Sequence, residues 1–244
     1  FAVRGLMAMG IYLDNDTMYD RGYRYLACLP GRKDDLPYQA GPPVQGSLIS
    51  EDEFKRDYNV TWPASGEEYH SDEALRYYIY RNGQCQESCR DQGHTMGGIG
   101  NYTAIAEMAW NQGDSLYGWL DNRILKGIEF NIRYNLSGIM SFPDQMQPWE
   151  PTAYTANEEE CTFENGKFYQ AVSRSKRWEA KSMASADRGK VFGPGGWKTQ
   201  ALEHYRVRAG VSVDDYVWLQ RAYDKMMADY GHENWGVAPN WYYE

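Results

Sequence analysis

Hydrophobic residues recur at intervals of three and four along most regular stretches of this chain, a spacing that places them on one buried face of an α-helix. The clearest run follows residue 95 and consists of Ile99, Tyr102, Ile105, Ala106 and Ala109. These positions predict a helix over residues 96–112 with one face in the core.

Two helices are predicted within residues 1–28. The first presents an apolar face made of Leu6, Met7, Met9, Gly10 and Leu13. The second carries Met18, Tyr19, Tyr23 and Leu26. The turn over residues 14–17 between them contains Asn and Asp, which cap helix N-termini. Residues 71–81 indicate a further short helix or strand.

The longest predicted helix covers residues 114–135, with Asp114 as its cap. Its apolar positions at helical spacing are Leu116, Trp119, Leu120, Ile124, Ile128 and Ile132. Two more helices are predicted over 197–209, where Gly210 ends the helix, and over 213–230.

Proline and glycine gather in two long stretches, residues 29–66 and 137–196, which show no regular pattern. Such stretches are typical of surface insertions. Helices in succession with few alternating runs predict an all-α, layered fold. We expect a single domain over residues 1–244, with the loops gathered around a functional site.

Composition narrows the choice of partner. A net charge of −9 argues against nucleic acid, whose phosphates require a basic surface. No apolar run reaches the ~18 residues of a membrane span. The chain holds 21 Tyr and 9 Trp, whose flat apolar faces and polar edges suit sugar rings, although core filling explains most of them.

Cysteines and glycosylation sequons indicate the compartment. The four cysteines match no zinc pattern, and sequons begin at Asn15, Asn59, Asn101 and Asn135. Together they favour a secreted glycoprotein with up to two disulfides. No signal peptide is present and the chain starts at Phe1, so we expect a processed or missing N-terminus.

A polar cluster lies immediately before the helix expected over 96–112. Arg90, Asp91, Gln92 and His94 fall within five positions, so they are expected at the approach to the helix or in its first turn. Helix N-termini carry free N–H groups and partial positive charge, which suit a bound carboxylate. Arg90 and Asp91 could instead form a solvated ion pair, and His94 could be a hydrogen-bonded core histidine.

Several motifs resemble one enzyme family. They are Glu87-Ser88-Cys89-Arg90-Asp91-Gln92-Gly93-His94-Thr95, Trp110-Asn111-Gln112-Gly113, Leu116-Tyr117-Gly118, Asp121-Asn122-Arg123-Ile124-Leu125-Lys126-Gly127 and Tyr134-Asn135-Leu136. Over residues 82–138, and more weakly at His204-Tyr205, the chain resembles the alginate-lyase-like polysaccharide lyases, closest to polysaccharide lyase family 38.

This resemblance implies an (α/α) toroid, an incomplete barrel of paired helices with a substrate groove. It also implies β-elimination of a uronic-acid polysaccharide. Two departures stand out. The toroid needs more helices than the pattern provides, so we expect a fragment, or another chain that completes the toroid. Leu202 stands where the family commonly has a tyrosine.

Uronate elimination sets chemical requirements. The C5 proton is weakly acidic because its removal places a second negative charge beside the carboxylate, so donors must neutralise that carboxylate. Gln92, Arg90 and the helix N-terminus are candidates for this role. A base near C5 and an acid near O4 are also needed. His94 is the candidate base, or a further neutralising group.

A tyrosine is the expected proton donor to O4, and Tyr205 is the candidate. It would also serve as the base if a cation, Arg188 or Arg208, lowered its pKa. His204 could contact substrate or simply pack. Tyr205 could instead be a core aromatic, and Arg188 a solvated loop residue.

The leading hypothesis is therefore a lyase acting on alginate or glucuronan. The alternative is a non-catalytic carbohydrate-binding toroid protein. A third hypothesis is a glycoside hydrolase, which needs two carboxylates, with Glu87 and Asp91 as candidates. The expected partner is an anionic polysaccharide, with no nucleic acid, membrane, metal or cofactor.

Overall fold

A computed structural model describes residues 2–27, 75–89, 91–139, 141–151, 153–155, 166–168, 188–189 and 196–230. Its α-helices are α1 (Ala2–Tyr12), α2 (Asp16–Leu26), α4 (Leu75–Tyr78), α5 (Gln92–Asn111), α6 (Trp119–Leu136), α8 (Gly196–Leu202) and α9 (Val217–Tyr230). The shorter elements are η1 (Gln86–Cys89), η2 (Pro143–Gln145), β1 (Ala153–Thr155), β2 (Gly166–Phe168), η4 (Glu203–Arg208) and η5 (Val213–Asp215).

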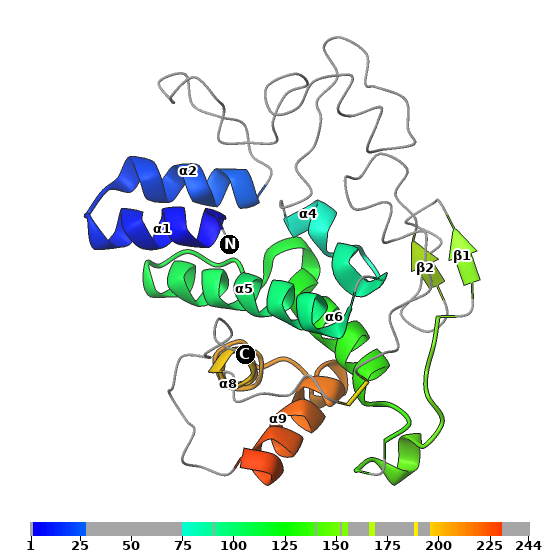
Figure 1. Cartoon of the computed structure of the whole chain (residues 1–244). Coiled ribbons are helices and arrows are strands. Elements are labelled where there is room, and N and C mark those ends of the chain that lie inside the picture. The colour runs from blue at the N-terminus through cyan, green and yellow to red at the C-terminus, as the bar shows by residue number, and fades with distance from the viewer. Residues whose placement is uncertain are drawn as a thin grey trace.

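Helix α5 is the central element of this arrangement. The α1/α2 pair lies on one side of it, and α8 and α9 lie on the other (Figure 1). Helix α5 also packs against α6, α1 packs against α2, and α8 packs against α9. The prediction of a mainly helical fold is confirmed. No helix within the described residues is long and apolar enough to cross a membrane.

The sequence of α5 accounts for its buried face and for the residue at which it starts. All five apolar positions predicted to share a face are buried: Ile99, Tyr102, Ile105, Ala106 and Ala109. The helix starts at Gln92 rather than at residue 96, because Asp91 takes the N-cap position with an extended backbone. The polar cluster from Gln92 to His94 is therefore the first turn, as one of the sequence expectations stated.

The α1/α2 pair departs from the predicted contact face. The buried residues of α1 are Val3, Met7 and Gly10, whereas Met9 and Leu13 are 51% and 58% exposed. The helices approach closely at Gly10, where a Cβ atom would come within 2.6 Å of the Tyr19 amide nitrogen. The predicted cap is confirmed, since the Asn15 side chain accepts a hydrogen bond from the Met18 amide at 3.0 Å.

Helix α6 begins later than predicted, at Trp119. Asp114 does not cap it; its carboxylate instead accepts a hydrogen bond from the Tyr19 hydroxyl at 2.8 Å. The residues from Leu120 to Asn122 have φ angles between 53° and 59°, a left-handed conformation that costs roughly 1–2 kcal/mol per residue. This kink separates the first residues from the regular helix, whose predicted core positions Ile124, Ile128 and Ile132 are buried.

The helix predicted over residues 197–209 is two elements. Helix α8 passes directly into the π-helix η4, and Gly210 follows with a φ of 62°. The second C-terminal helix is likewise divided into η5 and α9. The two carboxylate oxygens of Glu129 on α6 accept the second and third backbone amides of α9, from Trp218 at 2.9 Å and Leu219 at 2.7 Å. A buried carboxylate thus caps α9 across the helix interface.

The predictions for three further stretches, residues 71–81, 29–66 and 137–196, have different outcomes. Residues 71–81 contain α4, followed by an antiparallel bridge between Ile79 and Cys85. The insertion at 29–66 lies outside the described residues. Within 137–196 the structure describes η2 and a parallel pair of short strands, β1 and β2.

The glycosylation prediction is wrong at two of its four sites. Asn135 is fully buried, and Asn101 is 7% exposed with its amide donating to the Gly97 carbonyl at 2.8 Å. A glycan requires an exposed acceptor amide. Asn15 is exposed and Asn59 lies outside the described residues. Disulfide pairing is not described, because Cys28, Cys161 and the Cys89 side chain fall outside the described part of the chain.

Candidate functional site

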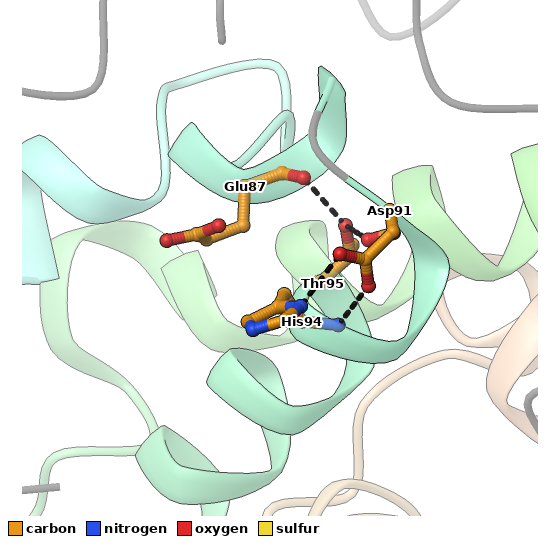
Figure 2. A network of polar contacts seen from close by, with 4 residues as sticks. All are labelled: Glu87, Asp91, His94 and Thr95. Atoms are coloured by element: carbon orange, nitrogen blue, oxygen red, sulfur yellow. Dashed lines mark hydrogen bonds and ion pairs between the residues drawn. The ribbon is translucent and has the colours of Figure 1, made fainter.

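The first turn of α5 carries a compact polar network (Figure 2). Asp91 Oδ1 accepts a hydrogen bond from the His94 amide at 2.7 Å, and Asp91 Oδ2 lies 2.6 Å from Nδ1 of the His94 ring. The Thr95 hydroxyl lies 3.0 Å from the Glu87 carbonyl oxygen and 2.9 Å from that of Asp91. One carboxylate therefore both caps the helix and orients the imidazole.

His94 is presented to solvent. Its side chain is 51% exposed, so the alternative interpretation as a core histidine is wrong. Because Nδ1 is engaged by Asp91, Nε2 is the ring nitrogen that can exchange a proton with a ligand. Figure 2 shows Nε2 on the side of the ring away from Asp91.

A second feature lies at the junction of the α5 N-terminus with the last turn of α6. Gln92 is 1% exposed, and its Oε1 accepts a hydrogen bond from Nδ2 of Asn135 at 3.1 Å. Asn135 in turn accepts the amide of Gly189. The structure thus brings Gln92 and the segment containing Arg188 together through a residue that the sequence analysis had noted only as a sequon and part of a motif.

The Arg188 guanidinium contacts three neighbouring residues, but only some of its N–H donors have a hydrogen-bond partner among the described residues. Its guanidinium carbon lies 3.8 Å from the ring centre of Tyr134. Nη2 donates to the Trp149 carbonyl at 3.0 Å and to Glu150 at 3.1 Å. Nε and Nη1 are buried and have no hydrogen-bond partner among the described residues. Two donors of a mostly buried cation therefore have no partner within the part of the chain that the structure describes.

The other predicted residues form a separate cluster. The His204 ring stacks on Tyr117 with 3.9 Å between ring centres and meets the edge of Trp110 at 4.8 Å. Arg208 donates to both oxygens of Glu107 at 3.0 Å, and Glu107 also accepts the Tyr117 hydroxyl at 3.0 Å.

Tyr205 belongs to the same cluster and is fully buried. Its hydroxyl donates to the Tyr117 carbonyl at 3.1 Å, and burial raises its pKa well above the ordinary value. Arg188, one of the two cations expected beside it, instead stacks on Tyr134. A buried phenol with a raised pKa and a main-chain partner is poorly placed to protonate a leaving oxygen.

The two clusters lie far apart on α5. Glu107 follows His94 by more than three helical turns, which corresponds to about 20 Å along the axis. The predicted convergence of His94 and Tyr205 is not seen among the described residues, where the Tyr205 hydroxyl bonds to the Tyr117 carbonyl and His94 bonds to Asp91. His204 packs in the aromatic cluster, where burial, with a further contribution from Arg208, lowers its pKa to about 4, against the opposing influence of Glu107.

Comparisons of this chain with protein-family models, with curated proteins and with solved structures found no match. A proposal of function therefore rests on the sequence motifs and on the geometry of the site. Arg90 lies outside the described residues. No group of three or more potential metal ligands occurs within the part of the chain that the structure describes.

Sequence reasoning missed Asn135 as the residue that joins Gln92 to the Arg188 segment. The signal was its place in the motif Tyr134-Asn135-Leu136, one turn after Asn131 on the same face of α6. It also missed Glu107, which links Arg208 to Tyr117. Neither contact is local in sequence, so periodicity could not reveal them.

Proposed function

We propose that this protein is a polysaccharide lyase that cleaves a uronic-acid polymer, alginate or glucuronan, by β-elimination. The observation that carries the proposal is the solvent-facing His94 ring, fixed through Nδ1 by the carboxylate that caps its own helix. An imidazole oriented in this way presents Nε2 to a bound sugar for proton transfer.

In the proposed reaction, Nε2 of His94 takes the C5 proton of the uronate. The electron pair of the C5–H bond forms the C4=C5 double bond, and the C4–O bond breaks with its electrons on oxygen. The imidazolium then returns the proton to O4 on the same face. Asp91 stabilises the positive charge that the ring carries between the two transfers.

Charge on the uronate carboxylate must be neutralised as the C5 proton leaves. Three features support this role for the same end of α5. The first-turn amides carry a partial positive charge, Arg188 has two buried donors without described partners, and Arg90 precedes the helix in sequence. Gln92 is too buried to reach solvent directly, and we assign it to holding this end of the site in place.

This proposal changes the residue that donates a proton to O4, which the sequence analysis had expected to be Tyr205. His94 serves as both base and acid, because Tyr205 in η4 is buried with its hydroxyl bonded to the Tyr117 carbonyl. His204 and Arg208 are assigned to the same distant cluster, so they do not contact the reacting sugar.

The larger architecture is also part of the proposal. The pairs α1/α2, α5/α6 and α8/α9 are neighbouring helices of the kind that build an (α/α) toroid. Further helices, from another chain or a longer form of this one, would complete it. The protein would act outside the cell, where such polymers occur.

A non-catalytic carbohydrate-binding protein is the second candidate. One observation favours it: within the described residues, the hydroxyls of Tyr19, Tyr117 and Tyr205 bond to groups other than His94. A protein of this kind would keep the anion-binding end of α5 and lack elimination.

Incubation with alginate and with glucuronan tests the proposal. A lyase generates the ultraviolet absorbance of an unsaturated uronate together with new reducing ends. A glycoside hydrolase gives reducing ends without that absorbance, and a binding protein gives neither while still retaining the polymer in calorimetry. Absence of the chromophore with both polymers contradicts the lyase assignment.

A further inference from the structure

The side chain of Asn135 is fully buried in the last turn of α6 and bonds both to α5 and to the segment containing Gly189. Its Nδ2 donates to Gln92 Oε1 on α5 at 3.1 Å. Its Oδ1 accepts the amide of Gly189 at 3.0 Å, and its main-chain oxygen accepts the same amide at 3.0 Å. One amide group therefore connects the first turn of α5 with the segment that carries Arg188.

The neighbouring residue reinforces this connection. Tyr134 lies under the Arg188 guanidinium, so two consecutive residues of α6 hold two consecutive residues, Arg188 and Gly189. The φ of Gly189 is +76°, a conformation that only glycine adopts without strain. The position of Arg188 is thus set from α6, and Asn135 relates it to α5.

We infer that Asn135 is a positioning residue for carboxylate recognition, which places the buried donors of Arg188 in register with the N-terminal end of α5. The inference rests on the proposed function of that end of α5. Removing the Asn135 side-chain amide breaks its hydrogen bonds to Oε1 of the buried Gln92 and to the Gly189 amide. The segment containing Arg188 and Gly189 then shifts relative to the N-terminal end of α5. Uronate binding then weakens because its carboxylate no longer meets both groups at once.

Asn131 provides a matched control one turn earlier on α6. Its side chain is also fully buried; its Oδ1 accepts the Ser88 hydroxyl at 2.7 Å, and its Nδ2 donates to the Gly83 and Gly127 carbonyls at 2.9 and 2.8 Å. Residue type, helix and burial are therefore the same, but none of these partners belongs to the Arg188 segment. Loss of Asn131 costs stability without disturbing the register between Arg188 and α5.

The experiment compares Asn135→Asp and Asn135→Ala with Asn131→Asp and Asn131→Ala in the full chain. Calorimetry measures binding of a glucuronan oligosaccharide and of its carboxyl-reduced, neutral counterpart. Amide hydrogen exchange follows Gly189, and thermal unfolding records stability. Gln92→Met is a further variant that removes the acceptor on the α5 side, in case substitution of Asn135 prevents folding.

Wild-type protein is expected to prefer the charged oligosaccharide. In the Asn135 variants and in Gln92→Met this preference falls about tenfold, the loss of roughly one hydrogen bond to a charged group. Affinity for the neutral sugar stays unchanged, and Gly189 exchanges faster in the Asn135 variants. The Asn131 variants keep the preference even where their unfolding temperature falls equally.

Two results overturn the inference in distinguishable ways. If the wild type prefers the charged sugar and the Asn135 variants keep that preference, or lose it only to the extent that the Asn131 variants do, Asn135 is merely structural. If the wild type binds neither sugar, the proposed function itself fails and carboxylate recognition fails with it.

Discussion

His94 Nδ1 lies 2.6 Å from Oδ2 of Asp91, the residue whose other oxygen caps the helix that begins at Gln92. The helix start and the orientation of the ring therefore depend on a single carboxylate. Because the cap residue and His94 are three positions apart, the N-cap geometry brings the side chain of one against the other.

Replacing His94 with alanine tests the proposed base. We expect elimination to fall about 100-fold to 10,000-fold, the usual contribution of a general acid–base group. Thermal stability should change little, because the side chain is half exposed. The measurement is the rate of chromophore formation with glucuronan or alginate. A rate within threefold of wild type would remove His94 from the mechanism.

Tyr205→Phe is the complementary experiment on the buried tyrosine. The substitution should leave the rate per folded molecule unchanged, because the hydroxyl lies in the distant aromatic cluster. It should reduce the free energy of unfolding by about 1 kcal/mol, since the Tyr117 carbonyl loses its donor. Denaturant unfolding and the elimination assay check the two parts. A large loss of rate without loss of stability would restore Tyr205 as the acid.

Two substitutions of Asp91 separate its two roles. Asn is as good an N-cap as Asp, so Asp91→Asn should keep α5 while losing the charged partner of His94. We expect about tenfold slower elimination at unchanged stability. Asp91→Ala should slow the reaction similarly and also cost about 1 kcal/mol of stability. Equal rates for wild type and Asp91→Asn would show that the ring needs no charged partner.

Glu129 should make stability depend on pH. Burial raises its pKa to about 7 from 4.5, although the amides of Trp218 and Leu219 oppose the shift. Between these values the native state holds a proton that the unfolded state has lost. The free energy of unfolding should therefore fall by about 3 kcal/mol as pH rises from 4.5 to 7.

Glu129→Gln removes this titration, so its free energy of unfolding should vary less over the same pH range. Denaturant titrations at several pH values measure the difference between the two proteins. Parallel pH profiles for wild type and Glu129→Gln would contradict the assignment.

His204 should produce the opposite dependence at lower pH. Its folded pKa is lowered to about 4, chiefly by burial, whereas the unfolded value is about 6.5. The unfolded state binds the proton first, so stability is lost as pH falls from 6.5 to 4. His204→Phe keeps an aromatic ring against Tyr117 and should resist this acid destabilisation. Thermal unfolding between pH 7 and 4 provides the comparison, and an equal decline in both proteins would exclude His204 as the cause.

The sequence could predict what depends on local periodicity and on caps. The buried face of α5, from Ile99 to Ala109, follows from its spacing because a helix places residues three and four apart on one side. The sequence left Gln92 and His94 either before the helix or in its first turn, and the Asp91 cap seen in the structure places them in the first turn. The start of α6 was misjudged because Asp114 has the chemistry of a cap but bonds to Tyr19 on a different helix.

The sequence by itself thus determined a helical chain and a polar helix N-terminus, whereas the structure showed that Asp91 holds His94 there. Only the tertiary structure decided which candidates meet. It joined Gln92 to the segment containing Arg188 through Asn135, and it buried Tyr205 with its hydroxyl bonded to the Tyr117 carbonyl. The physical reason is that helix periodicity fixes which face of a helix is buried, whereas packing between distant segments fixes which end of that helix a side chain reaches.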